Sequence, residues 1–91
     1  MNKKSRAVVT VVGKDSVGIL AGVSAACAKA NANVIEVTQS VLEEFFCMIM
    51  IVDISEANMQ IDEMQVAISE ASPGMKVHVM HENIFDSMHR I

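Results

Sequence analysis

One short segment of the chain combines residues that can hold a small anion: Val11-Val12-Gly13-Lys14-Asp15-Ser16-Val17-Gly18-Ile19-Leu20. An apolar stretch leads into Gly13, and Gly18 opens an amphipathic stretch. A strand, a short loop with glycine at both ends and a helix N-terminus leave several backbone N–H groups unpaired and directed outward. The segment therefore predicts a loop that binds a carboxylate or another small anion.

Other kinds of chemistry lack the residues they need. The spacing of Gly13 and Gly18 invites comparison with a phosphate-binding P-loop, but Lys-Ser or Lys-Thr does not follow the second glycine. His78 and His81 are three apart on an expected strand, so they face opposite ways and do not suit a shared metal. No pair of titratable groups stands out as an acid and a base. We therefore expect no catalytic residue, no metal site and no cofactor.

The composition narrows the class of protein. The 91 residues carry a net charge of −4, with no Trp, no Tyr and three Phe, so we expect no nucleic-acid partner. The longest apolar run, 45–52, is too short to span a bilayer, and the basic N-terminus makes a poor signal peptide. Cys27 and Cys47 lie in apolar patterns, so we expect free core thiols in a cytoplasmic protein, neither nucleophiles nor a disulfide.

The first half of the chain reads as strand, helix, strand. Residues 7–12 form a β-branched run typical of a buried strand, and 19–30 carry apolar residues at three- and four-residue steps, which predicts a helix. Alternation over 34–42 predicts a half-buried strand, with Ile35, Val37 and Val41 on its apolar side. We expect Ser16 to cap the helix and Asn31 to take the left-handed position after it.

The second half repeats this order. After a turn at Glu43-Glu44, residues 45–54 are apolar on both faces, which is typical of a strand covered on both sides. The spacing of apolar residues over 61–71 predicts a second helix, ended by Ser72-Pro73-Gly74, and 75–79 alternate as a last strand.

Two βαβ units joined by a hairpin predict an α+β protein with the ferredoxin-like βαββαβ sandwich, in which a four-stranded antiparallel sheet carries both helices on one face. We expect residues 6–82 to form this domain and 83–91 a short C-terminal helical tail of the same domain. The sheet face without helices would expose Ile49 and Ile51, so we expect a second subunit or the C-terminal helix to cover it.

The segment 11–20, the run Ala32-Asn33-Val34-Ile35-Glu36 and the βαββαβ order together resemble the ACT domain, a small regulatory ligand-binding module. The resemblance covers nearly the whole chain. It is strongest to free-standing bacterial ACT proteins, the glycine-cleavage regulators and the ACT segment that precedes formyltetrahydrofolate deformylases. Those relatives carry Asp, two variable residues and Gly-Ile at the first strand–helix loop, which corresponds here to Asp15-Ser16-Val17-Gly18-Ile19. Val17 stands where relatives often have Pro, and Asn31 where they usually have Gly.

The resemblance implies that two copies pair side by side and join their sheets into one. An amino acid would bind between the first loop of one subunit and the start of the second strand of its neighbour. Carried over residue by residue, one wall of this site consists of Lys14, Asp15, Gly18 and Ile19, and the other of Asn33, Val34 and Ile35.

Four of these residues also have a purely structural interpretation. Gly18 can allow a positive φ as well as the approach of a ligand, and Asp15 can cap the helix or hold an ammonium group. Lys14 can be a solvated charge or a carboxylate ligand, and Asn33 a turn residue or a partner of an amino acid's α-groups. The sequence leaves these alternatives open.

Two functions are compatible with these expectations. The first is a non-catalytic regulatory module, a homodimer or higher oligomer, that binds a small amino acid or related metabolite at a subunit interface. The alternative is a protein-interaction module that binds no metabolite and docks on a regulated enzyme. Binding of an amino acid by the isolated protein distinguishes the two.

Overall fold

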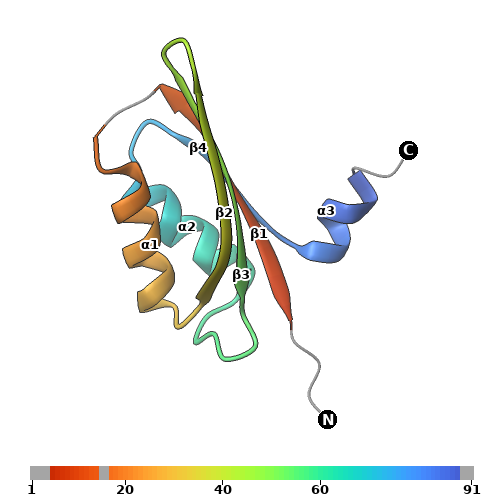
Figure 1. Ribbon diagram of the computed structural model, residues 1–91. Helices are drawn as coiled ribbons and strands as arrows, with labels where there is room; N and C mark the ends of the chain where they lie inside the picture. The colour runs from red at the N-terminus through yellow and green to blue at the C-terminus, as the bar shows by residue number, and fades with distance from the viewer. Residues whose placement is uncertain (1–4, 15–16, 89–91) are drawn as a thin grey trace.

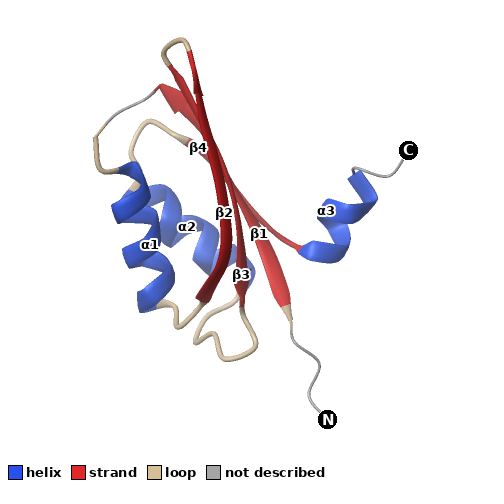
Figure 2. Ribbon diagram, viewed as in Figure 1, coloured by secondary structure: helices blue, strands red, loops and turns tan. Residues whose placement is uncertain are grey.

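The alternating segments of the chain pair into one antiparallel sheet in the order β2-β3-β1-β4. The computed structural model describes residues 5–14 and 17–88. Helices α1 and α2 cover one face of the sheet, and α3 lies on the other side (Figure 1). The predicted ferredoxin-like βαββαβ fold is confirmed (Figure 2). In chain order the elements are β1 (Arg6–Lys14), α1 (Ile19–Lys29), β2 (Asn33–Leu42), β3 (Phe45–Asp53), α2 (Ile61–Ala71), β4 (Lys76–His81) and α3 (Glu82–Met88).

The core lies between the sheet and the two helices α1 and α2. In the central strands Met48 pairs with Val11 and Met50 pairs with Val9, and all four side chains are fully buried. Helix α2 adds Met64 and Ile68 from its inner side, and the helix α1 adds its own apolar stripe. Unbranched methionines fit the irregular space between sheet and helices. The predicted separation of β3 into two faces is therefore confirmed.

Helix α1 is flanked on both sides by a residue with positive φ. The N-cap position is Gly18, with φ 86°, and not the predicted Ser16, which lies outside the described residues. The predicted left-handed residue after the helix is confirmed, since Asn31 has φ 58°. Its side-chain amide donates a hydrogen bond to the carbonyl oxygen of Glu56 at 2.9 Å, which ties this turn to the loop before α2.

Strand β2 is far more exposed than the predicted half-buried strand. Every residue of β2 is exposed except Val34, which is partly buried. The pairing with β3 shifts between Val34 and Glu36, so a β-bulge at Ile35 interrupts the alternation. Val37 and Val41 pair with core residues of β3, yet they remain 36% and 55% exposed because β2 lies at the edge of the sheet.

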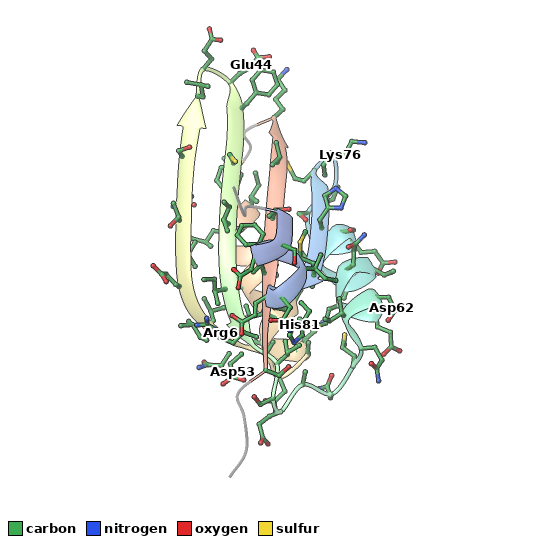
Figure 3. All side chains as sticks on the ribbon, turned by 90° about the vertical axis from the view of Figure 1, so that its right-hand side faces the viewer. Arg6, Glu44, Asp53, Asp62, Lys76 and His81 are labelled. Carbon is green, nitrogen blue, oxygen red and sulfur yellow. The ribbon has the colours of Figure 1, made fainter. Side chains whose placement is uncertain are left out.

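The sheet face turned away from α1 and α2 is here named the open sheet face. α3 packs on it against β1 and β4 (Figure 3), and Val8 beneath is only 3% exposed. The expectation that a C-terminal helix covers this face is thus confirmed for one part of it. By strand register the face carries Val8, Thr10, Val12, Lys14, Glu36, Thr38, Ser40, Leu42, Phe45, Cys47, Ile49, Ile51, Lys76, His78 and Met80.

The two cysteines occupy different environments. Cys27 is fully buried on α1, and its desolvation raises the pKa of the thiol. Cys47 is exposed, so the expectation that both cysteines belong to the core is wrong for this one. The cause is its parity on β3, which directs Cys47 to the open sheet face. Both thiols are free, as expected.

Candidate functional site

Helix α1 starts at the N-cap residue Gly18, which has no side chain with which to cap it. Gly18 is exposed, and its φ of 86° is a left-handed conformation that side chains rarely adopt. A Cβ on Gly18 would meet no atom within 4 Å, so the space beside this backbone is empty. Lys14 is exposed at the end of β1, whereas Asp15 lies outside the described residues. The first N–H groups of any helix lack intrahelical partners, and the start of α1 is therefore the place where the predicted anion site would lie.

Ile19 contributes to this wall only through its backbone. Its side chain is 7% exposed and packs into the core under α1. The first hydrogen bond of the helix runs from the N–H of Gly22 to the carbonyl oxygen of Gly18 at 2.9 Å. The N–H groups of the preceding turn, including that of Ile19, are the donors that a helix start leaves without an intrahelical partner.

The second predicted wall lies at the start of β2. Asn33 is exposed, Val34 is partly buried against the core, and Ile35 is 45% exposed at the β-bulge. The bulge turns an apolar side chain outward beside an exposed amide. An exposed edge strand with this composition suits contact with a second molecule better than burial within its own chain.

One chain does not bring the two walls together. The loop at Gly18 lies at one end of α1 and the start of β2 lies at the other (Figure 1). A helix of 11 residues separates the two ends by about 16 Å. A small amino acid is shorter than that, so a site containing both walls needs a second copy.

Two hollows that sequence patterns did not predict occur elsewhere. A groove of about 370 Å³ runs between α1 and α2, over the small residues Gly22, Ala26 and Ala71. A cleft of about 320 Å³ lies between Phe85 of α3 and the open sheet face. Both arise from the way helices meet distant elements, and local periodicity carries no signal of that. Neither contains a residue of the predicted walls.

An ion pair between described residues lies at the opposite face of the sheet, on β1 and α3. Arg6 donates two hydrogen bonds from Nε and Nη2 to Oε2 of Glu82, at 2.9 and 2.7 Å. The hydrogen bond and the charge of the partner raise the pKa of Arg6 and lower the pKa of Glu82. The pair links β1 to the first turn of α3.

The described residues contain no cluster of side chains that could bind a metal ion. Within residues 5–14 and 17–88, no three His, Cys, Asp or Glu side chains gather closely enough to hold a metal ion. His78 lies on the open sheet face, whereas His81 pairs with Ala7 of the opposite parity, so the predicted divergence of the two is confirmed. Over the same residues, none of the helices has the length and apolar character that crossing a membrane requires.

Known proteins match both the sequence and the fold. The model of the ACT domain family matches residues 5–81. A UPF0237 protein of Methanopyrus kandleri is 42% identical over 89 residues, which cover 96% of this chain and 99% of that protein. An ACT domain protein from Streptococcus pneumoniae has a TM-score of 0.75 at 31% identity, over 96% of this chain and 100% of the other.

Two more distant structures share the fold alone. A formyltetrahydrofolate deformylase from Pseudomonas syringae has a TM-score of 0.72 at 21% identity, over 89% of this chain and 28% of the enzyme. A structure assigned to a glycine cleavage system transcriptional repressor has a TM-score of 0.71 at 18% identity, over 88% of this chain and 46% of the other. The family resemblance read from the loop motif is confirmed: this chain belongs to the ACT domain family.

Proposed function

We propose that this chain is a non-catalytic regulatory module that binds a small amino acid or related metabolite between two of its copies. The observation that carries the proposal is the empty space beside Gly18, where α1 starts on a residue without a side chain. The ligand carboxylate accepts hydrogen bonds from the N–H groups of that helix start. Its ammonium group faces Asn33 of the second copy or Asp15.

Pairing through the β2 edge accounts for a site built from two copies. β1 ends, α1 begins and β2 ends at the same end of the molecule, whereas β2 begins at the opposite end (Figure 1). When two β2 strands pair antiparallel around a two-fold axis, the start of one lies beside the end of the other. Asn33 and Ile35 of one copy then lie on the side where the other copy presents Gly18.

A site shared by two subunits gives the ligand a means of regulation. Binding that depends on contacts from both copies stabilises one relative arrangement of the subunits, and a coupling of about 1–3 kcal/mol is typical of such effects. The match of residues 5–81 to the ACT domain family supports a regulatory role. We infer that the module works in the cytoplasm. Its partners are a second copy of the chain and an enzyme that it regulates.

Calorimetric titration of the purified protein with each of the common amino acids tests the proposal. We expect one or a few small amino acids to bind, and Gly18→Asp to abolish binding because it places a negative charge where the carboxylate sits. Gly18→Asn is the matched control, since Asn has nearly the same shape and tolerates φ above zero without adding charge. No heat with any amino acid at millimolar concentration, from a folded oligomer, would contradict the proposal.

The alternative, a protein-interaction module without a metabolite, is favoured by one observation. Val37, Val41 and Leu42 leave apolar surface along β2, with exposed fractions of 36%, 55% and 76%. Under this alternative the titration is silent, and the protein captures one partner in a fixed ratio from the cell extract. Loss of that capture in Val41→Lys, with no amino acid bound, would support the alternative.

A further inference from the structure

The open sheet face leaves apolar side chains exposed from its middle to the end where the β2–β3 hairpin turns. Val12, Leu42, Phe45 and Ile49 are 42%, 76%, 53% and 37% exposed. With ordinary side-chain areas these fractions amount to an apolar patch of about 400 Å², a size that on a monomer usually marks a binding surface. Figure 3 looks onto this face, with α3 in front of part of it.

The position of α3 divides the face into a raised half and a flat half. α3 lies over β1 and β4, whereas no helix covers the β2–β3 half. Between Phe85 of α3 and the sheet, the cleft of about 320 Å³ extends as far as Cys47 and Ile49 on β3. On α3 itself, Ile84 is 55% exposed. The face thus presents one exposed apolar side chain on the projecting helix and, beside it, an apolar strip along β3 that is bordered by polar residues of β2.

We propose that two copies of this chain stack on their open sheet faces around a two-fold axis parallel to the strands, with α3 of each copy lying on the β2–β3 half of the other. A two-fold interface must be complementary to itself. This axis sets the raised half of each copy against the flat half of its partner. A perpendicular axis in the plane of the interface would instead set α3 against α3.

The area available matches what a stable dimer needs. Strands of about nine residues spaced about 4.8 Å apart make a four-stranded face roughly 20 Å by 30 Å. Its accessible surface, with α3 added, approaches the roughly 800 Å² per partner that stable complexes bury. In the stack, Ile84 of one copy packs near Ile49 of the other and closes the cleft. Cys47 becomes buried as a consequence.

Stacking is independent of the β2 edge that the proposed function uses. Edge pairing extends the sheet sideways, whereas stacking covers its open face, so one molecule can do both at once. Stacking alone gives a dimer. Both contacts together give a longer open assembly, because the stacking axis passes through the middle of the sheet whereas the pairing axis passes through its β2 edge, so the two axes do not meet. Titration with amino acids tests the site at the β2 edge and does not depend on stacking.

The free thiol of Cys47 reports directly on the stack. Its reaction with a coloured disulfide reagent is measured in the intact protein together with molar mass by light scattering, while buried Cys27 stays unreactive in the folded state. Ile84→Asp should lower the mass to that of the unstacked species, which is half the mass where stacking is the only contact, and should speed the Cys47 reaction by about tenfold or more. Phe45→Asp, at another exposed position of the face, should do the same. Val66→Asp is the matched control, since Val66 is 58% exposed on α2 and should change neither.

Three results would overturn the stack. In the first, Cys47 reacts equally fast in the original protein and in Ile84→Asp, and the two proteins have the same molar mass. Another is a lowered mass with an unchanged Cys47 rate, because association would then use a different surface. The third is protection of Cys47 that persists in both face variants at unchanged mass, which would assign the protection to α3 of the same chain. Circular dichroism of each variant checks that it is folded.

Discussion

The carbonyl oxygen of Ala71 lies where a side chain on Gly22 would have to stand. A Cβ on Gly22 would be 2.6 Å from that oxygen, well inside van der Waals contact. The neighbour is backbone, so it cannot swing aside as a flexible side chain does. α1 and α2 therefore meet through their backbones at this crossing.

Replacing Gly22 with Ala should lower the free energy of unfolding by about 1–3 kcal/mol, the usual cost of overpacking. The loss should appear although Ala favours a helix by about 1 kcal/mol over Gly. Urea unfolding followed by circular dichroism measures it. Ala28→Gly, on the exposed side of α1, is the control and should cost only the helix preference. A stabilised Gly22→Ala would mean that the helices do not meet this closely.

The turn between β2 and β3 holds a strained residue. Glu43 has φ 57°, a conformation that costs a side-chain-bearing residue about 1–2 kcal/mol. Glu43→Gly should therefore raise the thermal midpoint, with a gain of about 0.5–1 kcal/mol. Glu44→Gly, at the neighbouring position without positive φ, should give no gain. Equal effects of the two substitutions in a melting experiment would refute the assignment.

Met50 is a fully buried side chain on a central strand, and its sulfur lies 3.9 Å from Sγ of Cys27. Truncation in Met50→Ala should cost about 2–5 kcal/mol, because the transfer term and the cavity term add. Val66→Ala, at an exposed position, should cost less than about 0.5 kcal/mol. Chemical unfolding compares the two variants. A loss below 1 kcal/mol at Met50 would show that the core there collapses around the gap.

The ion pair between Arg6 and Glu82 makes the free energy of unfolding depend on pH in the acid range. The folded state lowers the pKa of Glu82 below its ordinary value of 4.5, so the unfolded state binds the proton more readily. The contribution of the pair is present above that ordinary value and is lost as the pH falls through the lowered pKa. Glu82→Gln should therefore weaken the dependence of the thermal midpoint on pH below about 4.5, the ordinary pKa of the carboxyl. Glu70→Gln, exposed on α2, should leave the profile unchanged, and identical profiles for Glu82→Gln and the original protein would rule the contribution out.

Local patterns predicted the fold because each element carries its own signal. The helical spacing in 19–30 and 61–71 predicted α1 and α2, and the apolar run at 45–54 predicted β3. The expectation that β3 is covered on both faces is wrong within one chain, because alternate residues from Phe45 to Ile49 are exposed. The exposure of Cys47 was not predictable, because it depends on how much of the open sheet face α3 covers, and that is a long-range contact. The bulge at Ile35 escaped prediction for a related reason, since a shift in pairing depends on the partner strand as well as on β2.

The site was predictable only in part. Gly18 carries a signal in its residue type, and its positive φ agrees with that signal. The loop motif does not show that the side chain of Ile19 is buried in the core. At the start of a helix, the side chain and the N–H group of one residue point in different directions. Nor can spacing along one chain show that Gly18 and Asn33 lie at opposite ends of α1 in space.

Subunit complementation tests the shared site most directly. Gly18→Asp disables the loop wall and Ile35→Lys disables the strand wall, so each variant alone should bind no amino acid. In a mixed dimer one site carries both substitutions and the other carries neither, so unfolding and refolding an equal mixture should restore about one quarter of the binding sites by random pairing. A mixture as silent as its two components, with mixed dimers demonstrated by mass, would contradict a site built from two copies.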